Sequence, residues 1–371
     1  MKKKHSKNWR LLFATLTLLV GSSLYATEHS ATTTNLSTLL TTGTAAGDTV
    51  KLANDIPIGA KITVGASGII LDGDGHTISG DNMFLLFELD PSDISSINNI
   101  TFEKGNNLST TLTGLAVYTS KKRGGAIYIN ENSDIKINNA KFLNNEANYG
   151  GAIGIFGEFS GEIINSTFYR NVTSGANPID NGGAIHASGK FLGNIINSEF
   201  KENSADSGGA IYVANPFSGN IENTKFLNNK AINNTAATGG AISAEYFTGI
   251  IKNSEFFENE ADMGGAISLS YDFTNSSSII NSIFEKNSAL GIGSLSTGNG
   301  GAINVGGFSP EDLSGTKFIE NHASGDGGAI HASKNIAIHA KTGNVTFSGN
   351  TAGSTRNAIY AQNAGSYSLQ L

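Results

Sequence analysis

A four-residue motif, Gly-Gly-Ala-Ile, recurs through this chain and sets the strongest limit on its fold. It occurs eight times, and a copy of a second motif, Phe-x-x-Asn, follows each of its copies at a nearly constant distance of 17 to 20 residues. The glycine pairs are Gly124 and Gly125, Gly150 and Gly151, Gly182 and Gly183, Gly208 and Gly209, Gly239 and Gly240, Gly264 and Gly265, Gly300 and Gly301, and Gly327 and Gly328. The second motif runs from Phe142 to Asn145, Phe168 to Asn171, Phe200 to Asn203, Phe226 to Asn229, Phe256 to Asn259, Phe284 to Asn287, Phe318 to Asn321 and Phe347 to Asn350. Such repetition is typical of a solenoid.

The length of the repeat selects among the solenoids. Successive glycine pairs lie 25 to 36 residues apart, too far for the hexapeptide turn of a left-handed β-helix, and the repeat lacks the helical face of leucine-rich or ankyrin units. Short β-prone stretches bounded by Gly and Asn indicate two or three strands in each coil. The sequence therefore predicts an all-β fold, a right-handed single-stranded parallel β-helix over residues 49–371, with regular repeats at about 100–360.

Stacking gives each motif residue a structural role. Equivalent residues of successive coils lie roughly 4.8 Å apart, so the Phe side chains should form an aromatic column in the core. The motif Asn should form a hydrogen-bonded ladder at a turn and also adopt the left-handed αL conformation there. The glycine pair supplies a bend without a Cβ, and an Ala two residues after most motif Asn residues leaves room near the core.

The N-terminal region has two expected parts. Residues 1–26 begin with basic residues, continue with an apolar run from Leu11 to Val20 and reach Ala26, which predicts a secretory signal peptide. Residues 27–48 are predicted as a leader and cap, in which Leu36, Leu39 and Leu40 have helical spacing. The last residues, 360–371, show no comparable cap pattern, so self-association through that end is a further expectation.

Charge and cysteine content bound the partners. Removal of residues 1–26 would leave 19 Lys and Arg against 31 Asp and Glu, a formal net charge of −12. An acidic surface disfavours nucleic acid, and the mature chain lacks an apolar run long enough for a membrane helix, so we expect only an indirect association with membrane. The chain contains no cysteine, so its stability must come from its apolar core.

The alternating motifs resemble the passenger region of the chlamydial polymorphic outer-membrane protein family, over roughly residues 100–360. The resemblance rests on the Gly-Gly-Ala-Ile and Phe-x-x-Asn residues alone. It implies a β-helix exported as an autotransporter passenger, displayed at the bacterial surface and acting in adhesion to host cells. The family's middle domain and C-terminal β-barrel have no recognisable counterpart before Leu371, which leaves open a truncated or split member, a secreted passenger, or one retained by a partner.

Residues that suggest catalysis are few. The mature chain has three arginines and no Asp-Asp pair, whereas polysaccharide-active β-helix enzymes need carboxylates or a carboxylate, Ca²⁺ and Arg cluster on one face. The segment Asp72 to His76, with Asp81 nearby, is interpreted as a turn rather than a calcium loop. His186 and His331 both follow Gly-Gly-Ala-Ile and are interpreted as equivalent surface positions on distant coils. No catalytic, cofactor-binding or metal-binding residue is predicted.

Variation in length falls at one turn of the coil. The step from each glycine pair to the next Phe is nearly constant, whereas Val172 to Asn181, Lys230 to Thr238 and Ser288 to Asn299 carry extra residues on alternate coils. Insertions on one face of a solenoid often mark its binding face, although tolerated drift explains them equally well. The candidate partner-binding residues in these loops are Ile179, Ile232, Leu290, Ile292 and Leu295.

The functional expectation is a surface-exposed or secreted, adhesin-like and non-enzymatic passenger, which binds a host-cell surface protein or glycan without a cofactor. It would be exported through the inner membrane and would reside at the cell surface, in the outer membrane or outside the cell. Two alternatives stay open: a polysaccharide-active lyase or hydrolase, and a purely structural or antigenic surface protein.

Overall fold

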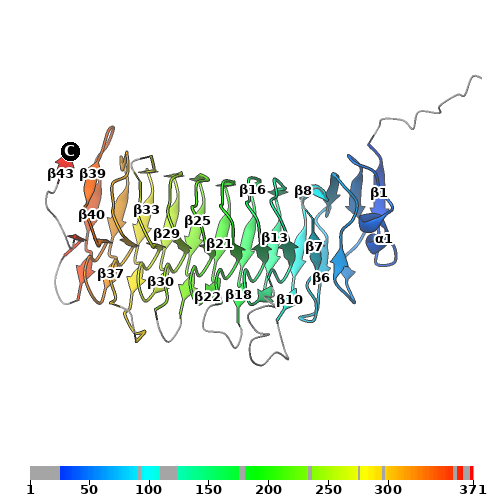
Figure 1. Cartoon of the computed structure of the whole chain (residues 1–371), viewed down its shortest axis with the longest axis horizontal. Helices are drawn as coiled ribbons and strands as arrows, with labels where there is room; N and C mark the ends of the chain where they lie inside the picture. The colour runs from blue at the N-terminus through cyan, green and yellow to red at the C-terminus, as the bar shows by residue number, and fades with distance from the viewer. Residues whose placement is uncertain are drawn as a thin grey trace, which may run out of the picture.

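The structure is a computed structural model that describes residues 26–90, 93–108, 123–174, 180–232, 236–274, 276–294, 297–353, 357–361 and 368–370. The signal peptide predicted at residues 1–26 therefore lies outside the described residues, apart from its last position. The described chain is an elongated stack of coils, with residue 26 near one end and the red C-terminal strands at the other (Figure 1). This is the all-β parallel β-solenoid that the repeat predicts.

The strand that follows each glycine pair belongs to a parallel sheet of eleven strands, here called the Gly-Gly sheet. In β23, Ile211 and Val213 point into the core and Tyr212 points outward, as the alternation of side chains in a strand requires. Its strands are β4 (Ile62–Thr63), β7 (Phe87–Leu89), β11 (Ile127–Ile129), β15 (Ile153–Ile155), β19 (Ile185–Ala187), β23 (Ile211–Val213), β27 (Ile242–Ala244), β31 (Ile267–Leu269), β35 (Ile303–Val305), β38 (Ile330–Ala332) and β42 (Ile359–Ala361).

The next side of each coil forms a ten-stranded parallel sheet, which also contains the first strand of the chain. Its strands are β1 (Glu28–Ala31), β2 (Thr49–Leu52), β5 (Ile69–Asp72), β8 (Ile94–Asn98), β12 (Lys136–Asn138), β16 (Glu162–Ile164), β20 (Asn194–Ile196), β24 (Ile221–Glu222), β28 (Ile250–Lys252) and β32 (Ser278–Ile280). The helix α1 (Leu36–Thr41) contacts β1 and β4 and buries Leu36 and Leu40, so it covers apolar side chains at the first coil (Figure 1).

The motif Phe residues lie in the second sheet of eleven strands, here called the Phe sheet. Its strands are β3 (Ile56–Pro57), β6 (Thr77–Ser79), β9 (Thr101–Glu103), β13 (Lys141–Leu143), β17 (Thr167–Tyr169), β21 (Glu199–Lys201), β25 (Lys225–Leu227), β29 (Glu255–Phe257), β33 (Ile283–Glu285), β36 (Lys317–Ile319) and β40 (Thr346–Ser348). Register pairs Phe with Phe from β9 to β40, and the rings stack with centroids 4.6–5.2 Å apart and planes within 1–23° of parallel.

A fourth side of the coil corrects the expectation of two or three strands. Two-residue strands follow each motif Asn and form a nine-stranded sheet, here called the Ala sheet, whose second position in most strands is a buried alanine. Its strands are β10 (Asn106–Asn107), β14 (Glu146–Ala147), β18 (Val172–Thr173), β22 (Ser204–Ala205), β26 (Lys230–Ala231), β30 (Glu260–Ala261), β34 (Ser288–Ala289), β37 (His322–Ala323) and β41 (Thr351–Ala352). These strands are too short to give a periodic signal, so the sequence pattern is that of a turn. Outside the four sheets, β39 (Ala337–His339) pairs with β43 (Ser368–Gln370).

The corner between the Phe and Ala sheets contains the asparagine ladder. Each motif Asn is buried. In all of them except the last, Asn350, the backbone N–H and Nδ2 donate to Oδ1 of the Asn in the next coil, with Nδ2–Oδ1 distances of 2.9–3.0 Å. The expected αL conformation is not at this residue. It lies one position earlier, where φ is between +51° and +55° at Asn144, Arg170, Glu202, Asn228, Glu258, Lys286 and Glu320. The preceding residue makes the bend, and this leaves the motif Asn free to point inward.

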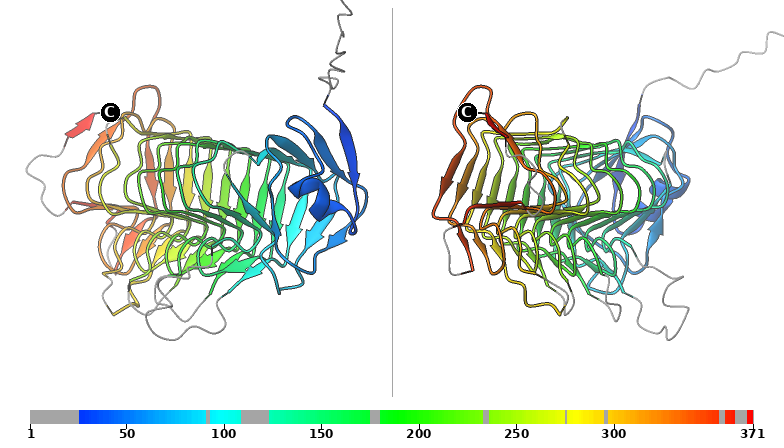
Figure 2. Two further views of the ribbon diagram at one scale, coloured as in Figure 1. Left: turned by 45° about the vertical axis from the view of Figure 1, so that its right-hand side comes forward. Right: turned by 60° about the vertical axis from the view of Figure 1, so that its left-hand side comes forward.

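The glycine pair makes the next corner, at the other end of the Ala-sheet strand. The first glycine of all eight pairs has φ between +62° and +72°, which a residue with a Cβ rarely adopts. The second glycine lies against the next coil: a Cβ on Gly209 would be 2.1 Å from the carbonyl oxygen of Gly240. Both positions are therefore restricted to glycine by the spacing of the coils. The two turned views in Figure 2 show the corners aligned along the stack.

Candidate functional site

The long turns predicted from sequence lie on one edge of the solenoid, between the Ala sheet and the Gly-Gly sheet. Their first two residues are strands β18, β26 and β34, so the sequence-based bounds at Val172, Lys230 and Ser288 begin too early. These three strands are alternate members of the Ala sheet, which places the loops about 10 Å apart along the axis. We call this surface the loop edge.

Two of the five candidate residues, Ile179 and Leu295, lie outside the described residues. Of the others, Ile232 and Ile292 are 46% and 67% exposed, whereas Leu290 is half-buried. An exposed isoleucine on each of two neighbouring loops is more apolar surface than a solvated turn requires. The structure thus places two of the predicted residues on the surface of one edge.

The short turns between the loops hold the loop backbone. Asp262 accepts hydrogen bonds at Oδ1 from the N–H groups of Ile292 and Gly293, at 3.0 and 3.2 Å. Its Oδ2 accepts from the N–H of Ala237 in the preceding loop, at 3.1 Å. One buried carboxylate therefore anchors both flanking loops. Beneath them Ala237 packs with Ala231 and Ala261 in a small buried cluster.

The first loop has the same kind of anchor. Oδ2 of Asp206 accepts from the backbone N–H of Asp180 at 3.0 Å, and Asn148 donates to the carbonyl of Ser174 at 3.3 Å. The anchors occupy one position of the repeat, directly after the residue that ends each two-residue strand. These anchors were not predicted from the sequence. A signal was present, because Asn or Asp occupies this position in short turns and in none of the three long loops.

Asp180 is a buried carboxyl at the base of the first loop. Its pKa is raised to about 7, mainly because burial removes hydration and also because the Asp206 carboxylate is near, while a hydrogen bond with Asn148 acts in the opposite direction. The pKa of Asp206 is also raised, mainly by burial. In the folded protein Asp180 therefore binds a proton between about pH 4 and pH 7 that the unfolded chain has lost.

We expect Asp180→Asn to stabilise the protein at pH 8 and to have little effect near pH 4. The unfolded chain loses the Asp180 proton near pH 4, whereas the folded chain keeps it until about pH 7, so the free energy of unfolding falls as the pH rises from about 4 to 7. Above pH 7 the wild-type fold holds a buried charge, and the uncharged amide of asparagine removes that cost. The gain at pH 8 should be about 1–3 kcal/mol, measured by urea unfolding at both pH values. Asp134→Asn, at an exposed carboxylate, is the control. Identical pH profiles for wild type and Asp180→Asn would refute this assignment.

The two histidines occupy equivalent positions, but they are buried, so the interpretation as surface residues is wrong. Each is the middle residue of a Gly-Gly sheet strand, β19 or β38. His186 lies between the rings of Tyr149 and Tyr212, with centroids 5.0 and 5.4 Å away. His331 stacks on Tyr360 at 5.4 Å, and burial lowers its pKa. Neighbouring rings cover these positions even though they point away from the core.

The carboxylates of Asp72 to His76 stabilise a turn. Oδ1 of Asp72 accepts from the backbone N–H of Asp74 at 3.0 Å, and Asp74 has φ +49°. His76 contacts Asp55 at 3.2 Å, and Lys51 pairs with Asp74 at 3.4 Å. Among the described residues, no group of three or more His, Asp and Glu side chains has the arrangement of a metal site.

A second aromatic column was also missed. Phe159, Phe191, Phe217, Phe247, Phe273 and Phe308 are buried beside the ten-stranded sheet, with centroids 4.8–5.6 Å apart and planes tilted by 35–60°. Each lies eight or nine residues after the first glycine of its coil. That constant spacing is the signal that the sequence carries for this column.

Comparison with known proteins identifies the repeat. The family model of the Chlamydia polymorphic membrane protein repeat matches residues 197–214, 315–333 and 344–362, each of which contains a motif Phe or a glycine pair and their strands. Searches among curated proteins and among solved structures gave no match. In the described part of the chain no helix has the length and apolar character needed to cross a membrane. Three segments of the chain thus match the Chlamydia polymorphic membrane protein repeat.

Proposed function

We propose that this protein is a non-enzymatic, adhesin-like solenoid that is displayed at the cell surface or secreted and binds a host-cell protein or glycan through the loop edge. The observation that carries the proposal is the combination of exposed Ile232 and Ile292 with loop backbones held by Asp262. Loops fixed in position lose little conformational freedom on binding, and their apolar side chains gain from burial.

The repeat type supports the cellular location. Proteins named for this repeat are membrane proteins of Chlamydia, and the N-terminal basic and apolar pattern of this chain favours export. The acidic composition favours a protein or glycan partner over nucleic acid. Contact with the membrane would then be indirect, through a partner or another domain.

We expect the double variant Ile232→Ser/Ile292→Ser to bind cultured epithelial cells at least tenfold more weakly than the wild type. Burying an isoleucine at an interface stabilises a complex by roughly 1.5–3 kcal/mol, so the loss of one contact of this size already gives a tenfold change. The measurement is saturation binding of purified residues 27–371 to cells. Ile250→Ser is the matched control, because Ile250 is 37% exposed but lies in β28 of the ten-stranded sheet.

Shortening all three loops to the length of the turn from Asn203 to Gly208 is the stronger version of this test. Loop length has a small entropic cost, so circular dichroism and melting should change little. Undiminished binding by a folded triple-loop variant would exclude the loop edge. Equal losses in the double variant and Ile250→Ser would point to a nonspecific apolar effect instead.

A further inference from the structure

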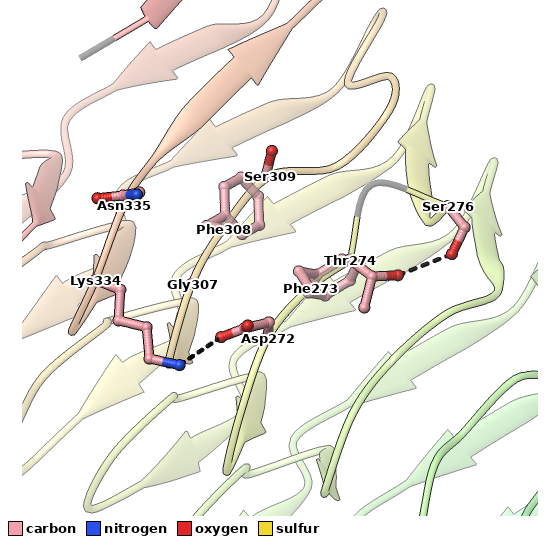
Figure 3. Close-up of a pocket in the computed structure, with 9 residues that line it drawn as sticks. All are labelled: Asp272, Phe273, Thr274, Ser276, Gly307, Phe308, Ser309, Lys334 and Asn335. Carbon is pink, nitrogen blue, oxygen red and sulfur yellow. Dashed lines mark hydrogen bonds and ion pairs between the residues drawn. The ribbon is translucent and has the colours of Figure 1, made fainter. Parts of the chain in front are cut away.

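Two adjoining depressions lie near the C-terminal end of the solenoid, on the outer side of the Gly-Gly sheet and at the corner that leads to the ten-stranded sheet. Their volumes are about 650 and 470 Å³, and both are lined by Lys334. Figure 3 shows the larger one, with Asp272, Gly307 and Lys334 on three successive coils. We call the two depressions together the corner notch.

A glycine corner in the middle coil creates the notch. The coil that begins at Gly300 turns through Gly306 and Gly307, whereas the coils on either side carry Tyr271 and Lys334 at this corner. A Cβ on Gly306 would be 2.7 Å from the carbonyl oxygen of Tyr271, so the close approach of the coils requires glycine there. The corner therefore has no side chain in the middle coil, and the two neighbouring coils form its walls.

Tyr271 is the aromatic wall of the notch. One face of its ring stacks on Tyr246 of the preceding coil, with centroids 4.7 Å apart and planes 11° from parallel. In the following coil, this corner consists of Gly306 and Gly307. The second face of the Tyr271 ring therefore has no side chain from that corner packed against it. The side chain of Tyr271 is accordingly 45% exposed.

The rest of the lining is rich in hydroxyl and amide groups. The smaller depression is lined by Thr238, Ser243, Ser268, Ser270, Asn304 and Ser333. The larger one adds Thr274, Ser309 and Asn335. Its charges are balanced, because Nζ of Lys334 lies 3.5 Å from Oδ1 of Asp272 across the glycine corner. A phosphate or sulfate group would find one cation there, and that cation already has a carboxylate partner.

From this chemistry we propose that the corner notch binds a short neutral glycan. An aromatic face packs against the C–H face of a sugar ring, and surrounding hydroxyl and amide groups exchange hydrogen bonds with sugar hydroxyls. The residues that line the notch come from four successive coils, so it spans three coil spacings, about 14 Å, which accommodates at least a disaccharide. Tyr271, Asp272 and Lys334 lie at the end of the Gly-Gly sheet strands opposite to the loop edge, and only the far side of the smaller depression reaches the loop edge, at Thr238. The proposal does not use Ile232 or Ile292, so it does not depend on the function proposed for the loops.

The test is binding of purified residues 27–371 to an array of neutral di- to hexasaccharides of hexoses and N-acetylhexosamines, beside sialylated and sulfated counterparts. We expect saturable binding to neutral members. Tyr271→Ala should weaken this binding at least tenfold, whereas Tyr271→Phe, which keeps the ring, should bind within about twofold of wild type. Phe156→Ala is the control, because Phe156 is 53% exposed at the corresponding corner of a distant coil.

Circular dichroism and melting of each variant establish that the fold is retained. The proposal is overturned if no neutral glycan binds, if only charged glycans bind, or if folded Tyr271→Ala binds like the wild type. It is also overturned if Phe156→Ala loses as much binding as Tyr271→Ala. Because the readout uses isolated glycans and changes residues other than Ile232 and Ile292, its failure leaves the cell-binding test of those two residues unaffected.

Discussion

Replacing Asn229 by leucine is expected to lower the free energy of unfolding by about 3–5 kcal/mol, because several buried polar groups lose their partners at once. The side chain of Asn229 donates to Oδ1 of Asn259 and to the carbonyl of Phe200, and it accepts from the backbone and side-chain N–H groups of Asn203. Leucine has a similar size and none of these groups. The measurement is urea unfolding of residues 27–371, followed by circular dichroism.

The control for this variant is the adjoining residue. Asn228 has φ +55°, a conformation that glycine adopts without a steric penalty, so Asn228→Gly should be nearly neutral. A small effect at Asn228 with a large one at Asn229 would locate the stabilisation in the ladder. If Asn229→Leu unfolds at the wild-type urea concentration with an unchanged slope, the ladder does not stabilise the stack as described.

Phe226→Ala is the second change with a large expected effect, a loss of about 3–5 kcal/mol from the cavity left by a buried ring. Phe226 is fully buried between Phe200 and Phe256, with ring centroids 5.0 and 4.8 Å away. The cavity would also interrupt the Phe column at this coil, so Phe200 and Phe256 would each lose a stacking partner. Thermal and urea unfolding with the same purified chain measure the loss.

Phe257 provides the matched control. It follows Phe256 in β29 but points outward, where it is half-buried beneath the side chain of Lys286. Phe257→Ala should therefore cost about 1 kcal/mol or less, since little cavity is left at a surface. Comparable losses for Phe226→Ala and Phe257→Ala would mean that the two faces of the Phe sheet are not distinguished by burial.

Most of the fold could be predicted because the repeat reports the same contact many times. A single Phe between polar residues is weak evidence, but eight at one place in the coil indicate a column, and the column fixes the direction of stacking. The fourth strand was missed because two residues, as in Glu146–Ala147, carry no period. The αL position was misplaced by one residue because asparagine adopts this conformation more readily than the charged residue that precedes it in most coils, such as Arg170 or Glu202.

The candidate site was less predictable, since its contacts join residues far apart in the chain. The loops were visible as added length, but their anchor, Asp262, bonds to Ala237 and Ile292, 25 and 30 residues away. The corner notch depends on the alignment of Tyr271, Gly307 and Lys334 in three successive coils. The coil that contains Gly307 is one residue shorter at this corner than the coils on either side of it. The sequence pattern therefore does not show that the three residues are neighbours.

The most direct test of the central claim, that this solenoid binds a ligand and does not transform one, is a single incubation with two readouts. Purified residues 27–371 are added to epithelial cells and, separately, to the acidic polysaccharide polygalacturonate, and both bound protein and newly formed reducing or unsaturated sugar ends are quantified. We predict saturable binding to the cells and no new sugar ends from the polysaccharide. Release of such ends would establish a polysaccharide-active enzyme, and the absence of saturable binding would leave a structural or antigenic surface protein; either result would contradict the proposed function.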